Sequence, residues 1–406
     1  MKPIGPLPPE FAAQTGALSI GGRCYDEWLS QAGATPAFVY DIGVVRARIA
    51  RFRAAMPEGV GLHYAIKANP FASLLAQVAP LVDGLDIASG GELAMAAPHG
   101  KPISFAGPGK RDDELAAAIG AGVTINLESE GEATRALAVA RRLGVRARLA
   151  VRVNPDLELR GSGMKMGGRA SPFGVDAERV PALVRLLIDA GADWRGLHIF
   201  AGSQSLDATA LIETQRATLA LAARLAEEAG AAPPLVNLGG GFGVPYFAGD
   251  KPVDVEAIGS ALGDALARRS AILGDTRFAL ELGRWLVAEC GVYLTRVIDR
   301  KQSRGETFLV VDGGLHHQLA ASGNFGTVVR RNYPVAVAGR MGEPADDPVS
   351  VVGCLCTPLD RLADRVLLPR AEPGDVIAIF MAGAYGLTAS PNTFLGHSVP
   401  TELVTP

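Results

Sequence analysis

The octapeptide HYAIKANP, residues 63–70, has the form of a short buried strand that ends in a lysine. Gly61 precedes the strand, and the pair Asn69-Pro70 after it is a turn signal. A lysine at such a strand end is expected to be poorly hydrated, and burial lowers a lysine pKa because it penalises the charged form. A neutral amine is a nucleophile toward carbonyl carbon, so Lys67 is a candidate for covalent catalysis. The alternative, which the octapeptide alone favours, is a lysine whose ammonium extends into water.

Short apolar strands alternate with amphipathic helices on both sides of this stretch. Strands are predicted at residues 37–41, 63–67, 84–88, 103–105, 123–126, 147–153, 194–200, 235–238 and 277–281, with a helix in most intervals. Units repeated at this spacing indicate parallel strands joined by crossover helices. About eight such units predict an α/β fold, a (β/α)8 barrel, whose functional residues follow the strand ends. Lys67, Asp86, His198, Gly239 and Glu281 all lie at such ends.

The pattern changes after about residue 285. Strands are predicted at 287–297, 307–311, 334–337, 349–352 and 376–380, with few helical stretches between them. The sequence therefore predicts a barrel domain over residues 36–284 and a β-rich sandwich or barrel domain formed by residues 285–406 together with residues 1–35.

Composition excludes several classes of partner and site. With 406 residues the chain is expected to form two domains, and a net charge of -3 argues against nucleic acid as a partner. No apolar run reaches the ~18 residues that span a bilayer, and the N-terminus lacks a hydrophobic signal core, which indicates a cytoplasmic protein without a membrane partner. The four cysteines are too few for a disulfide framework. Cys354 and Cys356 form a Cys-x-Cys pair with no second cysteine pair or histidine cluster beside it in the sequence, so no metal site is predicted.

Three further motifs follow barrel strands. The loop NLGGGFG, residues 237–243, can turn backbone N–H groups toward an anion, although such loops also serve as plain turns. It lacks the Gly-Lys-Ser/Thr of a P-loop and lies too late in the chain for the dinucleotide fingerprint. Glu281 and Arg284 lie in ELGR, where they are either an ion pair or a partner for a nitrogen heterocycle. His198 is either a core histidine or a ring that stacks on an aromatic cofactor.

Taken together these motifs resemble a known family. Lys67, His198, the Gly239–Gly241 loop and Glu281-x-Gly-Arg284 occur in the order and separations of the fold-type III pyridoxal-phosphate decarboxylases, which act on ornithine, arginine and diaminopimelate. Cys356 and the triplet Gly383-Ala384-Tyr385 extend the resemblance, which covers residues 35 to 400. It implies an alanine-racemase-like barrel, a carboxy-lyase reaction and pyridoxal 5'-phosphate as cofactor.

The resemblance also implies roles for single residues. Lys67 would bind the cofactor aldehyde covalently, Glu281 would pair with the pyridine nitrogen, and His198 would stack on the ring. The phosphate and its surroundings would be held by Ser203, Gly239, Gly240, Gly241, Gly283, Arg284 and Tyr385, with Asp86 and Glu92 in support. Cys356 would come from the partner subunit and help to return a proton to the substrate carbon, so the active site would be shared across a homodimer.

The distal substrate pocket departs from the family pattern. After Asp312-Gly313-Gly314, diaminopimelate decarboxylases have an arginine where this chain has Ala320. The family's Cys-Glu-Ser-Gly-Asp is CTPLD here, so Thr357 replaces the acid that follows the cysteine. A distal carboxylate or amine on the substrate therefore loses its recognised partners, and the retained chemistry has a different specificity.

Two segments suggest what that specificity is. The glycine-rich stretch 161–174, with Lys165 and Arg169, has the composition of a lid that could meet an anion, or of a solvated loop. Together with LHHQL at 315–319 and Gly-Asn-Phe at 323–325, it resembles the exosortase-A-system-associated pyridoxal-dependent decarboxylases and a butirosin-pathway enzyme that decarboxylates a glutamyl unit on an acyl carrier protein. A substrate tethered to an acyl carrier protein is therefore one hypothesis, beside a small free amino acid.

Three alternatives stay open at this point. The chain could be a diaminopimelate decarboxylase proper, acting in lysine biosynthesis. An alanine-racemase-type enzyme would need a second base, usually tyrosine, and this chain offers Cys356 instead. A non-catalytic regulatory homologue that binds the cofactor would not need Lys67, Glu281, His198, Cys356 and Tyr385 together.

Overall fold

Eight parallel strands form a closed barrel in the computed structural model, which describes residues 1–156, 164–165, 170–323 and 330–406. The strands are β4 (Gly61–Ala65), β5 (Gly84–Ile87), β6 (Ile103–Phe105), β7 (Thr124–Leu127), β8 (Arg148–Asn154), β11 (Asp193–Ile199), β13 (Leu235–Asn237) and β14 (Arg277–Leu282). Each pairs with the next in this order, and β14 pairs with β4, which closes the ring. The predicted (β/α)8 barrel is confirmed.

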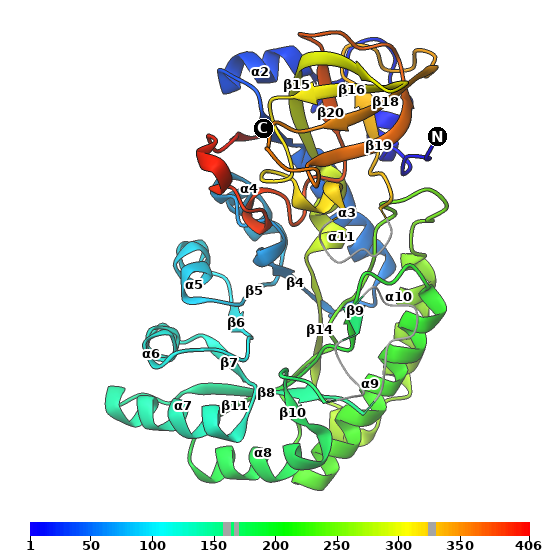
Figure 1. The fold of residues 1–406 in the computed structure, drawn as a ribbon. Coiled ribbons are helices and arrows are strands. Elements are labelled where there is room, and N and C mark those ends of the chain that lie inside the picture. The colour runs from blue at the N-terminus through cyan, green and yellow to red at the C-terminus, as the bar shows by residue number, and fades with distance from the viewer. Residues whose placement is uncertain (157–163, 166–169, 324–329) are drawn as a thin grey trace.

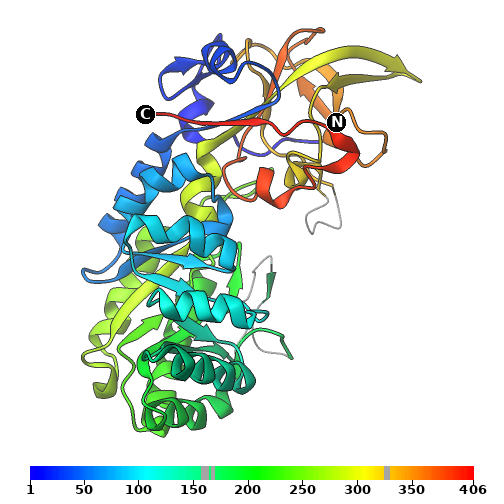
Figure 2. The same ribbon diagram turned by 90° about the vertical axis from the view of Figure 1, so that its left-hand side faces the viewer.

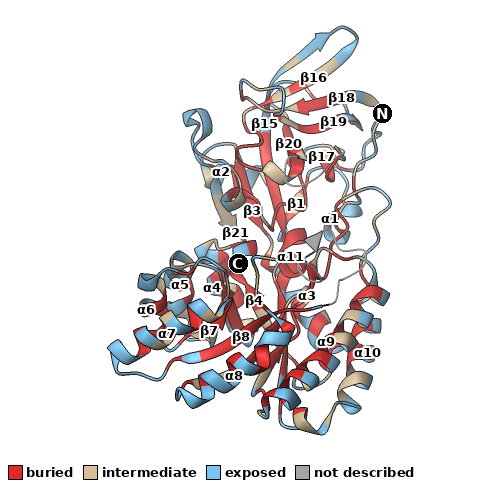
Figure 3. Ribbon diagram, turned by 60° about the horizontal axis from the view of Figure 1, so that its bottom comes forward, coloured by how far each residue is buried: buried red, intermediate tan, exposed pale blue. Residues whose placement is uncertain are grey.

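Helices surround the barrel, as Figure 1 shows. They are α3 (Ile42–Ala55), α4 (Ala72–Val78), α5 (Gly90–Ala96), α6 (Asp112–Gly120), α7 (Glu130–Leu143), α8 (Val180–Asp189), α9 (Ala208–Ala229) and α10 (Val255–Ala267). Side chains of Asp41, Ser89, Ser129, Asp207 and Asp254 accept backbone N–H bonds at the helix starts, where those groups have no intrahelical partner. The strands are buried while the outward sides of the helices are exposed (Figure 3), so the core lies between the two layers.

The second domain is built on an eight-stranded sheet. Its main path runs β17 (Val335–Val337), β20 (Val376–Ile379), β15 (Gly291–Ser303), β16 (Glu306–Val311), β18 (Asp347–Val352) and β19 (Arg361–Leu368). β3 (Ala37–Tyr40) pairs with β15 and with β21 (Thr401–Val404). The N-terminal segment adds α1 (Pro9–Ala12), the hairpin of β1 (Ser19–Ile20) and β2 (Arg23–Cys24), and α2 (Tyr25–Ala32).

Several predicted elements differ from the structure. The strand predicted at 37–41 as the first of the barrel is β3, whose four residues are all buried in the second sheet. Its apolar sequence fits a central strand of either sheet, so periodicity could not assign it. The strand predicted from residue 287 begins at Gly291, because the short helix α11 (Arg284–Val287) and a 3₁₀ turn precede it. β19 and β21 were not predicted, since their alternation of charged and apolar residues is weak.

Backbone and side-chain hydrogen bonds join the two domains next to Lys67. The Tyr385 N–H donates to the Ala68 carbonyl at 2.7 Å, and Asn69 Nδ2 donates to the Gly383 carbonyl at 3.0 Å. Arg48 of α3 forms an ion pair with Glu289. Both chain termini lie in the second domain (Figure 2). In the described part of the chain no helix is long and apolar enough to cross a membrane.

Candidate active site

Three candidate side chains meet at the carboxyl ends of neighbouring barrel strands. Lys67 lies in a 3₁₀ turn, Ile66–Ala68, directly after β4, and Glu281 lies near the end of β14. The register of these two strands sets Glu281 opposite His63 and Leu282 opposite Tyr64. Lys67 Nζ is 3.5 Å from Glu281 Oε1, and His198 Nε2 from β11 is 3.0 Å from Glu281 Oε2. The predicted grouping of Lys67, Glu281 and His198 at one end of the barrel is confirmed by this geometry.

Two glycines allow this close approach. A Cβ on Gly283 would lie 2.9 Å from the Ala68 side chain and 3.0 Å from the Ala65 carbonyl, on either side of Lys67 in the sequence. A Cβ on Gly240 would lie 2.1 Å from the Glu281 carbonyl oxygen. Real Cβ atoms do not come this near to backbone, so larger residues would push the β13 and β14 loops away from Lys67.

The charges of this site differ from the expectation for Lys67. Its side chain is 47% exposed, and its amine faces a carboxylate that is only 6% exposed. Desolvation lowers the pKa of Lys67, but attraction by Glu281 and Tyr385 outweighs it, so the pKa is raised above its ordinary value. The prediction that burial lowers this pKa is therefore wrong, because the octapeptide does not reveal the carboxylate that arrives from β14. Desolvation raises the pKa of Glu281, yet Lys67 and His198 together hold it well below its usual range.

The other end of the site has spare groups for an anion. Arg284 follows β14, and its Nη1 donates to the Tyr246 hydroxyl at 3.0 Å while its guanidinium carbon lies 4.6 Å from the Tyr385 ring centre. Arg284 Nε is buried without a hydrogen-bond partner. The N–H groups of Gly240 and Gly241 likewise have no partner among the described residues. An unpaired guanidinium nitrogen beside unpaired backbone donors suits a phosphate, so these residues fit the phosphate end of pyridoxal 5'-phosphate.

The remaining predicted residues lie around this centre or apart from it. Ser203 lies on the short strand β12 (Gly202–Ser203) after β11, and Gly239 is fixed by a bond from its N–H to Asn237 Oδ1 at 2.9 Å. Asp86 is buried on β5, with Oδ2 3.5 Å from His63 Nδ1. Glu92 Oε2 accepts the Ala88 N–H at 2.5 Å, and desolvation raises its pKa.

Cys356 is not part of this cluster within one chain. It lies exposed in the turn between β18 and β19 of the second domain. None of the interactions made by the described residues joins it to Lys67 or Glu281. An exposed thiol is available to a partner subunit, and its predicted role there stays a prediction.

Three residues near the site were missed. Arg152 of β8 adds to the attraction that lowers the pKa of Glu281, and Tyr246 holds Arg284. Gln318 is fully buried, both polar atoms of its amide lack partners, and Oε1 is 3.0 Å from where a Cβ on Gly386 would lie. Only Gln318 had a sequence cue, its place in the unusual LHHQL segment.

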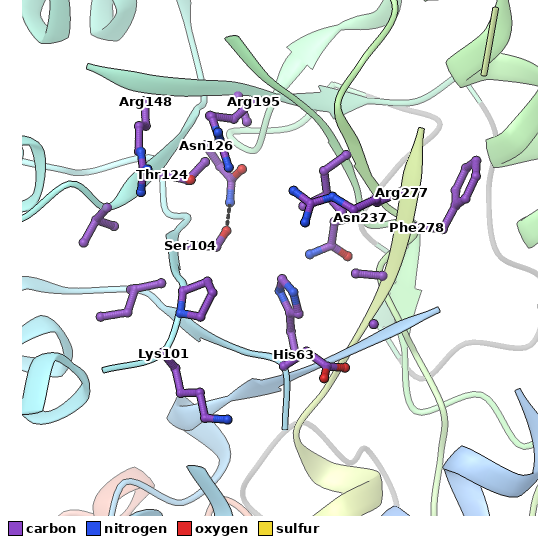
Figure 4. Close-up of a pocket in the computed structure, with 18 of the residues that line it drawn as sticks. His63, Lys101, Ser104, Thr124, Asn126, Arg148, Arg195, Asn237, Arg277 and Phe278 are labelled. Atoms are coloured by element: carbon purple, nitrogen blue, oxygen red, sulfur yellow. Dashed lines mark hydrogen bonds between the residues drawn. The ribbon is translucent and has the colours of Figure 1, made fainter. Parts of the chain in front are cut away.

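A second feature of the barrel is a cavity at the end opposite Lys67, lined by residues from the amino ends of the strands. Its volume is about 730 Å³, and Figure 4 shows side chains from several strands pointing into it. Arg148, Arg195 and Arg277 come from the amino ends of their strands, and Asn126 donates to Ser104 Oγ at 2.6 Å deeper inside. In barrels of this kind chemistry occurs at the carboxyl ends of the strands, so size alone does not make this cavity the active site. We place the candidate site at Lys67.

Half of the segment with a lid-like composition, residues 161–174, lies outside the described residues. Within it, the strand β9 (Met164–Lys165) pairs antiparallel with β12, with Ser203 opposite Met164. Residues 157–163 and 166–169, with Arg169, and residues 324–329 are not described. The predictions for Arg169 and for the Lys165 side chain are therefore not addressed by the structure.

Comparison with known proteins gives consistent matches over nearly the whole chain. A protein-family model described as "Pyridoxal-dependent decarboxylase, pyridoxal binding domain" matches residues 42–288. The L-glutamyl-[BtrI acyl-carrier protein] decarboxylase of Niallia circulans is 36% identical over 379 residues, which cover 91% of this chain and 88% of that protein. The diaminopimelate decarboxylase of Archaeoglobus fulgidus is 30% identical over 385 residues, covering 94% of this chain and 90% of that protein.

Solved structures of diaminopimelate decarboxylases have the same fold as this chain. The diaminopimelate decarboxylase of M. jannaschii in co-complex with L-lysine superposes with a TM-score of 0.86 at 26% identity, covering 96% of this chain and 91% of that one. The diaminopimelate decarboxylase of Helicobacter pylori complexed with L-lysine gives a TM-score of 0.82 at 27% identity, with 94% of each chain covered.

Proposed function

This chain belongs to the pyridoxal-dependent decarboxylases, and we propose that its substrate is an aminoacyl group carried on an acyl carrier protein. The enzyme is a carboxy-lyase that uses pyridoxal 5'-phosphate. The bound cofactor supplies an electron sink for the electron pair left on carbon when CO2 departs. What is proposed below is the role of each residue, the form of the substrate and the sharing of the site between subunits.

The roles follow from charge and position. Lys67 would hold the cofactor through its side-chain amine, which faces Glu281 at the carboxyl ends of the barrel strands. Glu281, kept ionised by Lys67, His198 and Arg152, accepts a hydrogen bond from a protonated ring nitrogen and so keeps that nitrogen protonated. His198 stacks on the ring. Arg284 binds the phosphate, together with Ser203, the Gly239–Gly241 loop and Tyr385.

The distal pocket carries the substrate proposal. Ala320 and Thr357 stand where members of the family have side chains that bind a distal carboxylate or amine, and neither can carry charge. Gln318 nearby offers an unpaired neutral amide, which can both donate and accept a hydrogen bond. A neutral amide suits a thioester or amide linkage better than a charged terminus, because a buried free charge needs an opposite charge. The 36% identity to a decarboxylase of a glutamyl group on an acyl-carrier protein supports the same substrate class.

A direct assay tests the substrate form. Release of CO2 is measured with glutamyl and other aminoacyl groups on a phosphopantetheinylated carrier protein, and with free glutamate, ornithine, lysine and diaminopimelate. We expect kcat/KM to be at least about 100-fold higher for one carrier-linked substrate than for any free amino acid, in the range that a built recognition site provides. Equal or faster turnover of free diaminopimelate would instead make the chain a diaminopimelate decarboxylase.

The shared active site has its own test. We propose a homodimer in which Cys356 of one subunit serves the Lys67 site of the other. Lys67→Ala and Cys356→Ala are each expected to be nearly inactive, and co-refolding them in equal amounts should restore about a quarter of the sites, because half of the dimers then contain one intact site. Absence of any recovery in a mixture shown to exchange subunits would contradict sharing.

A further inference from the structure

A cluster of two histidines and a cysteine lies in the second domain. One ligand atom from each of His316, Cys354 and His397 can be chosen so that all three lie within 4.8 Å of one another. Cys354 Sγ is 3.9 Å from both ring nitrogens of His397, and the His316 and His397 ring centres are 5.1 Å apart. We propose that these three side chains bind one Zn²⁺ ion.

His316 is the observation that points to a ligand. It is 0% exposed, and neither of its ring nitrogens has a hydrogen-bond partner. Leaving a buried polar group unpaired is unfavourable, so such groups are rare unless something binds them.

The fold brings the three ligands together from distant parts of the sequence. His316 follows β16 and Cys354 follows β18, and these strands are parallel neighbours whose carboxyl ends lie side by side. His397 comes from the segment that leads into β21. The sequence shows no histidine cluster beside the cysteine pair, because His316 and His397 come close to Cys354 only in the fold.

A second layer of hydrogen bonds fixes the chain beside each ligand. Asp360 accepts the N–H of Leu315 at 2.7 Å and the N–H of Leu355 at 2.9 Å, so one carboxylate holds the residue before His316 and the residue after Cys354. A Cβ on Gly353 would lie 2.1 Å from this carboxylate, so Gly353 is needed to admit it.

The third ligand is positioned by His317. Its Nδ1 is 3.0 Å from the Tyr293 hydroxyl and its Nε2 is 3.1 Å from the carbonyl of Ser398, the residue after His397. With Nε2 as donor and Nδ1 as acceptor, His317 is fully satisfied and is not a ligand. Outer groups of this kind are what orient the ligands of metal sites.

The kind of metal ion that the site would bind follows from the three donor atoms. One thiolate sulfur and two imidazole nitrogens suit Zn²⁺, which takes four tetrahedral ligands and leaves a water in the last position when the protein supplies three. Binding replaces the thiol proton of Cys354, which leaves to solvent, with the metal. Cys356 lies two residues beyond Cys354, so the ion would also fix the turn that presents Cys356 to the partner subunit.

Metal analysis of the tag-free holoenzyme tests the site. After incubation with Zn²⁺ and desalting, we expect about one zinc per chain in the wild type and in Cys24→Ser, a matched control thiol outside the cluster. Cys354→Ser, His316→Asn and His397→Ala should each lose most of it, and Co²⁺ loading should give a sulfur-to-metal charge-transfer band that Cys354→Ser abolishes. His397 lies at the surface, so its variant should fold even if the buried ones do not, and cofactor absorbance reports folding.

Two results would overturn the proposal. One is less than about a tenth of an equivalent of zinc in the wild-type holoenzyme. The other is zinc that His397→Ala and Cys354→Ser retain undiminished, which would mean adventitious binding elsewhere. Because zinc content is measured without turnover, neither result depends on which substrate the enzyme decarboxylates.

Discussion

Two lysines of the barrel, Lys67 and Lys110, occupy opposite environments. Lys110 has a side chain that is 1% exposed, and its ammonium donates to the Gly107 and Asn126 carbonyls at 2.8 and 2.9 Å and to Glu132 Oε1 at 2.8 Å. Lys67 is 47% exposed, and its one hydrogen bond to a described residue is the long contact of 3.5 Å to Glu281 Oε1. All three donors of Lys110 are used, whereas two of the three donors of Lys67 have no hydrogen-bond partner among the described residues.

The difference separates a structural lysine from a reactive one. Burial lowers the pKa of Lys110, and Glu132 offsets only part of that, while the pKa of Lys67 is raised. Burial alone would therefore single out Lys110 as the nucleophile, whereas we propose Lys67 for that role. A nucleophile must reach its carbonyl, and only the lysine with an open side and unused donors can do so.

The substitution Lys67→Ala should have the largest effect on cofactor attachment and activity, and so tests the contrast between the two lysines most strongly. We expect no covalent cofactor after dialysis and CO2 release at background, because the variant lacks the amine that we propose as the attachment point. Absorbance of the dialysed protein and a decarboxylation assay measure both. Lys110→Met should keep the visible cofactor band at temperatures where it remains folded; losing the band there would contradict the contrast.

Glu281→Gln tests the charge that raises the pKa of Lys67. We expect kcat to fall about 10²–10³-fold, because the neutral amide cannot hold a proton on the ring nitrogen. Removing the negative charge also lowers the pKa of Lys67, so in cofactor-free protein the amine should react with an aldehyde probe at lower pH than in the wild type. An unchanged pH profile would mean that Glu281 does not set this pKa.

Glu132→Ala tests whether the buried ion pair of Lys110 with Glu132 stabilises the fold. It leaves the Lys110 ammonium buried without its counter-charge, so the free energy of unfolding should fall by about 3–5 kcal/mol in chemical denaturation. Cofactor binding by the folded fraction should persist. The matched control is Arg370→Ala, which breaks the exposed ion pair with Glu372 and should change stability by less than about 0.5 kcal/mol. Equal effects of the two substitutions would show that Lys110 is not held as described.

The smallest expected effect is that of Tyr246→Phe. It removes the hydroxyl that accepts a hydrogen bond from Arg284, and such a bond is worth about 1 kcal/mol. The dissociation constant of the cofactor should therefore rise about fivefold, while the maximal rate of the loaded enzyme stays unchanged. Fluorescence titration of the cofactor-free protein gives the constant. Tyr25→Phe, in the second domain, is the control; a similar change there would rule out a specific role for Tyr246.

The barrel and the grouping of the main site residues could be predicted from the sequence, and single residues show why. Parallel strands put their carboxyl ends at one edge, so Lys67, His198 and Glu281 were expected together before any coordinates. The sequence does not predict the raised pKa of Lys67, because that pKa depends on the short distance between Lys67 and Glu281, which the small size of Gly240 and Gly283 permits. Strand pairing also cannot be read from the pattern of apolar residues. It decides both the place of β3 in the second sheet and the approach of His316, Cys354 and His397.

The most direct test is to trap the cofactor where it is attached. The holoenzyme is reduced with borohydride and digested, and the modified peptide is identified by mass spectrometry. The peptide that contains Lys67 should carry about one pyridoxyl group per chain, and the peptide that contains Lys110 should carry none. Modification at Lys110, or cofactor that binds without any trapped lysine, would contradict the assignment of Lys67 as the reactive lysine.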